Sequence, residues 1–150
     1  MIVFMFIGAA SGGTAGGIKI NTVTVLGAYV HSVLKNREDV RIMNYSVPYS
    51  RVLKAFLIFL FGLVVVMLGV FILVLSEDAP LIDIMFEVVS AFGTVGLSTG
   101  LTGSLSGLGR VIIIALMFTG RLGPLTILAA AAVKTKHVNI SYPQADINIG

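Results

Sequence analysis

The sequence contains no cysteine, and charged residues are scarce: Asp, Glu, Lys and Arg make up 11% of the 150 residues. The absence of cysteine excludes a disulfide framework, thiolate chemistry and a cysteine-ligated metal site. The scarcity of charge excludes an ordinary soluble domain, in which about a quarter of the residues are charged. Hydrophobic residues make up 57% of the chain and gather in long runs. We therefore predict an all-α membrane protein that lies in the lipid bilayer.

The beginning of the chain lacks the positively charged flank that a signal peptide needs. The first ten residues are apolar from Met1 onward, yet the run is too short to span a bilayer. We interpret it as part of an element that starts earlier, so we expect the chain to be the C-terminal part of a longer protein. A genuine short N-terminus is the alternative.

Two segments are long and apolar enough to cross a bilayer as helices. Ala55–Leu75 carries no charge, and at about 1.5 Å per residue it just spans the hydrocarbon core. Val111–Val133 is interrupted near its middle, and Ile20–Leu34 is shorter and partly polar. Met1–Ala10 and Leu81–Phe92 are too short to span, and each precedes a stretch rich in Gly, Thr and Ser. Irregular backbone at membrane depth must be buried or line a cavity, so both are candidate re-entrant pore helices.

The distribution of charge predicts the orientation in the membrane. Basic residues gather in the connection 35–54 and follow the last helix, whereas the connection between the two strong helices is acidic through Glu77, Asp78, Asp83 and Glu87. The positive-inside rule then places both basic segments, including the C-terminus, in the cytoplasm of a multi-pass plasma-membrane protein. This arrangement explains the net charge of +3 without a nucleic-acid partner.

One short element occurs twice, 80 positions apart. Met5-Phe6 followed by Gly13-Thr14-Ala15-Gly16 returns as Met85-Phe86 followed by Gly93-Thr94-Val95-Gly96. Gly-rich turns of this kind can align backbone carbonyls as a substitute for the hydration shell of K⁺. Glycines that serve helix packing are the alternative. The fixed spacing favours two turns of a K⁺ selectivity filter.

Two basic residues raise separate questions. A phosphate loop around Lys19 is excluded, because that pattern needs glycine before the lysine and Ser or Thr after it, and isoleucines flank Lys19. Arg121 lies inside the last apolar segment, where an arginine costs roughly 2.5–3.5 kcal/mol on insertion. It either faces an aqueous cavity, as an electrostatic barrier or gate partner, or it ties down the kink at Gly120–Pro124.

On these residues the chain resembles the Trk/Ktr/HKT superfamily of potassium transporters, and its Ktr-type membrane subunits most closely. Residues 5–19 resemble the third pore-loop signature of that family, 92–102 the fourth, and 117–126 the last helix with its arginine. The resemblance covers nearly the whole chain.

The resemblance implies a pore built from four covalently linked helix–pore-loop–helix repeats, of which this chain would hold the last one and a half. Residues 1–34 would end the third repeat, 35–54 form the cytoplasmic basic connection, 55–133 form the fourth repeat, and 134–150 form the cytoplasmic tail. The filter residues would be Thr14, Ala15, Gly16, Gly17, Thr94, Val95, Gly96 and Leu97. Arg121 would lie below the filter, opposite a gate within Thr22–Leu34.

The implied function is K⁺ uptake by gated permeation, not an enzymatic reaction. The resemblance implies a homodimer of membrane subunits, a cytoplasmic nucleotide-binding regulatory subunit and the missing N-terminal repeats as partners. It implies no cofactor and no metal beyond the transported K⁺, and leaves Na⁺ dependence open. One alternative is a substrate-coupled secondary transporter, against which we note that the sequence offers no membrane-embedded carboxylate for proton coupling. A non-conducting membrane scaffold is the other.

Overall fold

The computed structural model describes residues 1–8, 16–36, 39–42 and 45–123, and this part of the chain is mostly helical. The helices are α1 (Ile2–Phe6), α2 (Ile20–Leu34), α3 (Tyr49–Ser76), α4 (Leu81–Gly93) and α5 (Gly107–Leu122), with a 3₁₀ turn η1 at Leu101–Gly103. Two short strand pairs accompany them. β1 (Ile7–Gly8) pairs in parallel with β2 (Ile18–Lys19), and β3 (Arg41–Ile42) pairs antiparallel with β4 (Tyr45–Ser46).

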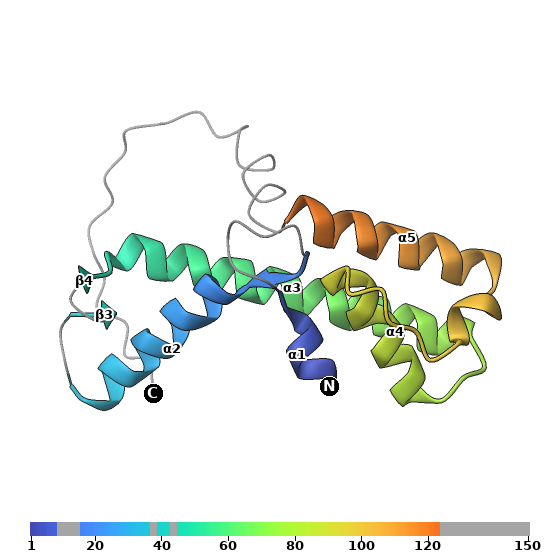
Figure 1. Ribbon diagram of the computed structural model, residues 1–150, viewed down its shortest axis with the longest axis horizontal. Coiled ribbons are helices and arrows are strands. Elements are labelled where there is room, and N and C mark those ends of the chain that lie inside the picture. The colour runs from blue at the N-terminus through green and yellow to red at the C-terminus, as the bar shows by residue number, and fades with distance from the viewer. Residues whose placement is uncertain (9–15, 37–38, 43–44, 124–150) are drawn as a thin grey trace, which may run out of the picture.

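The long helix α3 is the axis along which the other helices pack. In Figure 1, α2 runs beside one half of α3, while α4 and α5 lie beside the other half, with α1 against α4. The buried positions of α3 recur every three, four or seven residues, which places them on one stripe of the helix: Val52, Ala55, Gly62, Val66, Gly69 and Leu73.

Two glycines in that stripe let side chains of other elements reach the axis of α3. A Cβ at Gly62 would lie 3.0 Å from Ile18 and 3.3 Å from Phe92, and one at Gly69 would lie 3.0 Å from Leu116. Small residues at helix interfaces permit this close approach in membrane proteins. The contacts bring β2, α4 and α5 onto the same helix.

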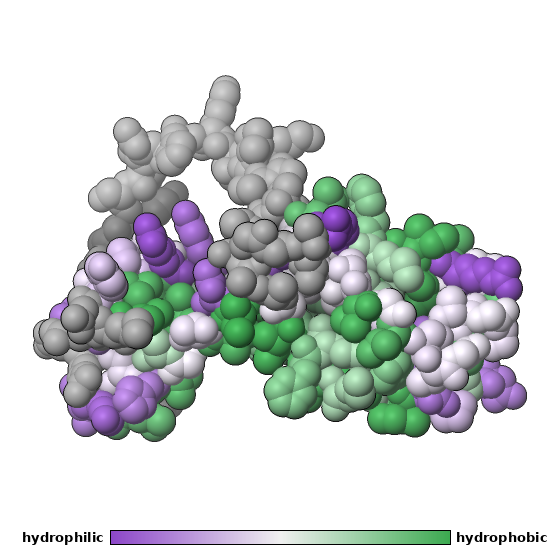
Figure 2. Space-filling view, in the orientation of Figure 1, coloured by the Kyte–Doolittle hydropathy of each residue, from purple (hydrophilic) through white to green (hydrophobic). Residues whose placement is uncertain are grey.

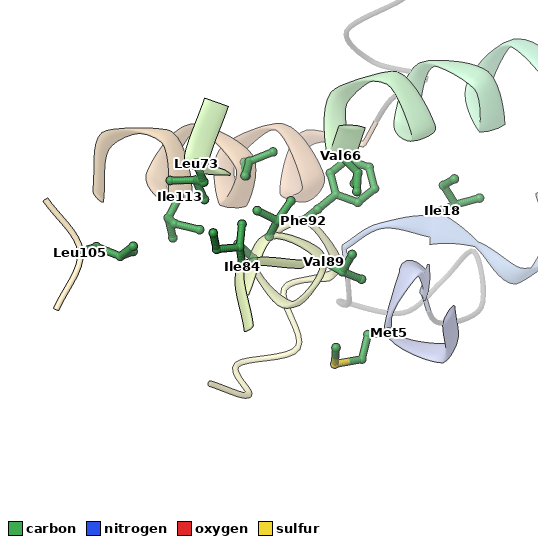
Figure 3. Close-up of a cluster of buried hydrophobic side chains, with 12 residues drawn as sticks. Met5, Ile18, Val66, Leu73, Ile84, Val89, Phe92, Leu105 and Ile113 are labelled. Carbon is green, nitrogen blue, oxygen red and sulfur yellow. The ribbon is translucent and has the colours of Figure 1, made fainter. Parts of the chain in front are cut away.

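Phe92, near the end of α4, lies at the centre of the buried core (Figure 3). Its side chain is fully buried, and its ring stacks on that of Phe6 with centroids 5.9 Å apart. Phe6 in turn meets the edge of Phe59 on α3, with centroids 6.0 Å apart. The core therefore joins the short N-terminal helix to the C-terminal end of α4.

The apolar surface outside this core is extensive. Among the helices of the described residues, α3 is long and apolar enough to cross a membrane. Of its most apolar stretch, 22% is buried inside the molecule. Figure 2 shows hydrophobic residues through the middle of the molecule and hydrophilic ones mostly towards its two ends. A surface of this extent needs an apolar environment, which lipid supplies.

Glu77 ties the start of α5 to the end of α3. The hydroxyl of Ser106 donates a hydrogen bond to the Glu77 carboxylate, as does the Ser106 backbone N–H at 3.1 Å. The Ser106 side chain also caps α5 by accepting from the Gly109 N–H. The pKa of Glu77 lies below its ordinary value because these bonds, that of the Ser106 hydroxyl foremost, stabilise the charged form.

The helical class agrees with the prediction from sequence, as do the bounds of α2 and α4, while three helices differ in their bounds. α3 begins at Tyr49 rather than Ala55, since Arg51 and Lys54 continue the helix beyond the apolar run. The first helix ends at Phe6 instead of Ala10, because Ile7 and Gly8 leave it to pair with β2. α5 begins at Gly107 rather than Val111 and ends at Leu122, and residues 124–133 of the predicted last helix lie outside the described part.

Gly120 on α5 offers a test of this packing. A Cβ there would overlap the backbone carbonyl of Phe92, so the backbones of α4 and α5 meet without a side chain between them. We expect Gly120→Ala to destabilise the protein by about 1–3 kcal/mol, as overpacking does.

The matched control is Gly27→Ala on α2, where an added Cβ has no neighbour within 4 Å. It should leave the stability unchanged or raise it, since alanine favours helix more than glycine does. Thermal melting of the detergent-solubilised protein distinguishes the two variants, and equal melting temperatures would contradict the packing.

Candidate functional site

The second Gly-rich turn begins where α4 ends in a left-handed cap. Thr94 has φ 52° and ψ 39°, and the N–H groups of Thr94 and Val95 donate to the carbonyls of Ala91 (3.1 Å) and Ser90 (3.0 Å). This hydrogen-bond pattern is a Schellman motif, in which glycine usually occupies the left-handed position. A threonine there is strained, so other contacts must hold it in place.

A hydrogen bond between the two turns supplies such a contact. The backbone N–H of Gly16 donates to the Thr94 hydroxyl at 2.7 Å, across 78 residues of sequence. A Cβ at Gly16 would lie 2.8 Å from the Thr94 methyl group and 2.9 Å from the Gly120 carbonyl oxygen. Position 16 therefore has room for glycine but not for a residue with a side chain. The structure thus brings Gly16 of the first repeated element against Thr94 of the second.

The strands that flank the first Gly-rich segment pair in parallel, Ile7 with Ile18 and Gly8 with Lys19. Gly17 follows Gly16 with φ 74°, and a Cβ on it would lie 3.3 Å from the Cα of Gly93. The two turns therefore meet backbone to backbone. Thr14 and Ala15, the other predicted filter residues of this turn, lie outside the described residues.

The second turn continues into exposed backbone at Val95, Gly96 and Leu97. Gly96 has φ 82°, with no atom within 4 Å of an added Cβ, so its conformation rather than space favours glycine. Positive φ at both Thr94 and Gly96 turns the peptide units on either side of Val95. The Leu97 carbonyl points back to α4, where the Ser90 hydroxyl donates to it at 2.5 Å.

Glu87 is a functional-site candidate that the sequence interpretation missed. The sequence counted it only as one acidic residue of the connection, whereas in the structure Glu87 is 4% exposed on α4 and accepts hydrogen bonds from the segment 98–102. A signal was present in the sequence. Glu87 and Ser90 are one helical turn apart, and the residues after Gly96 are rich in the Ser and Thr hydroxyls that such side chains bind.

Arg121 and the second turn line the same cavity. The cavity has a volume of about 620 Å³, and its walls include Glu87, Gly96, Met117 and Arg121. Arg121 lies in the last turn of α5 with an exposed side chain. Thr22–Leu34, the predicted gate region, is part of the continuous helix α2. In the described ranges, no cluster of three or more His, Asp or Glu side chains could hold a metal ion.

Comparison with known proteins relates the chain to ion transporters. A family model described as TrkH, cation transport protein, matches residues 1–141. The Ktr system potassium uptake protein B of Bacillus subtilis (strain 168) is 43% identical over 149 residues, which are 99% of this chain and 33% of the relative. The protein of the same name from Vibrio alginolyticus is 38% identical, over 100% of this chain and 33% of the relative.

A third relative carries a broader name. The potassium/sodium uptake protein NtpJ of Enterococcus hirae is 36% identical over 97% of this chain and 34% of its own length. The chain thus spans about a third of the length of these curated relatives. Since the family model covers almost the whole chain and describes transporters rather than enzymes, we conclude that the chain belongs to the TrkH family of cation transport proteins.

Proposed function

We propose that this chain supplies the last one and a half of four helix–pore-loop–helix repeats in a K⁺ uptake transporter, and that its two Gly-rich turns form half of a selectivity filter. The observation that carries the proposal is the hydrogen bond from the Gly16 N–H to the Thr94 hydroxyl, which joins the two turns at the end of α4. Glycines that only pack helices would not need a hydrogen bond from the Gly16 backbone to the turn that ends α4. The names of the relatives, Ktr potassium uptake proteins, support K⁺ as the ion.

In this proposal a dehydrated K⁺ meets backbone carbonyls of Thr94 and Val95, and of Thr14 and Ala15 in the first turn. The C-terminal end of α4 adds partial negative charge at the turn, which favours a cation. Leu97 serves as the anchor of the loop, because Ser90 already binds its carbonyl.

The proposal extends to topology and partners. The basic connection 35–54 and the tail 134–150 lie in the cytoplasm of a multi-pass plasma-membrane protein. The missing N-terminal repeats complete the ring, and a second membrane subunit and a cytoplasmic nucleotide-binding regulator join it. The relatives named as parts of a Ktr system support a multi-component assembly. The potassium/sodium name of the Enterococcus relative makes Na⁺ dependence worth measuring here.

One observation favours a second candidate function. Secondary transporters that couple to protons use buried carboxylates, and Glu87 is a buried carboxylate in the described part of the chain. Substitutions at Glu87 distinguish proton coupling from a role in positioning the backbone of the second turn.

Gly96→Ser tests the filter. A side chain at φ 82° is strained and disturbs the carbonyls beside it, so we expect a lower preference for K⁺ over Na⁺. The measurement is relative uptake of the two ions by the full-length transporter, obtained by joining this chain to the N-terminal repeats of a Ktr relative.

Gly107→Ser at the start of α5 is the matched control, since an added Cβ there has no neighbour within 4 Å. It should keep the parent preference. An unchanged preference in Gly96→Ser, with the protein present in the membrane, would refute the filter assignment.

Arg121→Ala tests the barrier role in the same transporter. Removal of a positive charge from the cavity beside the filter should change the K⁺ flux while the ion preference stays the same. Arg121→Lys keeps the charge and should retain more of the parent flux. Lost preference with normal flux would contradict this role and point to a contact with the filter itself.

A further inference from the structure

Glu87 is the one charged side chain that is buried within the described residues. It lies in the middle of α4, and the segment after the second turn surrounds its carboxylate with donors. Oε1 accepts from the Ser98 hydroxyl and from the Thr99 N–H at 3.0 Å, while Oε2 accepts from the Thr102 hydroxyl at 2.7 Å. A buried carboxylate needs such partners, because burial without them is costly.

Ser90, one turn further along α4, holds the near end of the same segment. Its buried hydroxyl donates to the Leu97 carbonyl at 2.5 Å. The Ser98 hydroxyl, bound to Glu87, also accepts from the Gly100 N–H at 2.9 Å. Two side chains on one face of α4 therefore fix the backbone from 97 to 102.

Besides these hydrogen bonds, Leu101 of the segment packs against the buried core. Residues 95–100 are exposed, and no atom approaches an added Cβ at Gly96 or Gly100 within 4 Å. The position of the backbone at Gly96 thus depends on hydrogen bonds to α4 on both sides. Ser90 and Ala91 bind it before Gly96 through the Schellman motif, and Ser90 and Glu87 bind it after. Glu87 alone accepts hydrogen bonds from three residues of the segment: Ser98, Thr99 and Thr102.

We propose that Glu87 is a positioning residue for ion selectivity: its carboxylate braces the 97–102 segment against α4 and thereby fixes the backbone of the second filter turn. The proposal rests on the filter function proposed above. Glu87 does not contact the ion and carries no proton across the membrane. Its effect therefore appears in the preference between ions rather than in coupling to a gradient.

The test compares Glu87→Ala with Glu87→Gln in the full-length transporter used above. We expect Glu87→Ala to lower the K⁺ over Na⁺ preference, taken from the ratio of KM values, by about tenfold, which equals roughly 1.4 kcal/mol. Glu87→Gln keeps an oxygen for the Thr99 N–H and an amide for the Thr102 hydroxyl. It should stay within about threefold of the parent, a difference below 1 kcal/mol.

Two further variants supply controls. Asp83→Asn removes a carboxylate one turn earlier on α4, in its first turn, and should keep the parent preference. Thr102→Val removes the donor to Oε2 and should lower the preference in the same direction as Glu87→Ala. Combined with Glu87→Ala it should add little, because both changes break one network.

Four outcomes would overturn the proposal. If Glu87 only stabilises the fold, Glu87→Ala will lower the amount of folded protein and the maximal flux, while the ratio of KM values for K⁺ and Na⁺ stays at the parent value. A proton-coupling role makes Glu87→Gln as defective as Glu87→Ala and makes uptake depend on the proton gradient. Normal preference in Glu87→Ala, alongside a lowered preference in Gly96→Ser, refutes the brace but leaves the filter. Normal preference in Gly96→Ser refutes the filter itself.

Discussion

The close approach of backbones around the end of α4 is the constraint on which the rest of the structure depends. Gly93 meets the Met5 carbonyl, Gly120 meets the Phe92 carbonyl, and Gly16 fits between Thr94 and Gly120. No side chain larger than hydrogen fits at these three positions. The absence of side chains there lets α1, α5 and Gly16 approach the end of α4, where the side chain of Phe92 is buried in the core.

Much of this arrangement could be predicted from the sequence, because apolar runs and the internal repeat are local signals. Ile20–Leu34 agrees with the observed helix, and a hydrogen bond joins Gly16 of the first repeated element to Thr94 of the second. Glu87 could not be placed in the same way. An acidic residue near a polar connection is normally exposed, and its burial depends on hydroxyl donors that lie eleven to fifteen residues later.

Two kinds of interaction, close glycine contacts and side-chain hydrogen bonds, hold different parts of the proposed filter. Glycine contacts fix where the turns lie relative to the helices, and polar side chains of α4 fix the direction of the exposed backbone that follows. The glycine contacts depend on the volume of the side chain at each position, so a larger residue there disturbs the packing, as in other close-packed interiors. The second kind depends on hydrogen-bond geometry, and it allows single polar substitutions to alter ion preference while the fold persists.

The central claim is that this chain contributes two of the four turns of a K⁺ filter and conducts only within the complete ring. The most direct measurement is K⁺ uptake by cells that lack their own potassium transporters, with this chain expressed alone or joined to the N-terminal repeats of a Ktr relative. We expect growth on low K⁺ with the joined protein and none with the chain alone. Absence of uptake by the joined protein, once its presence in the membrane is verified, would contradict the claim.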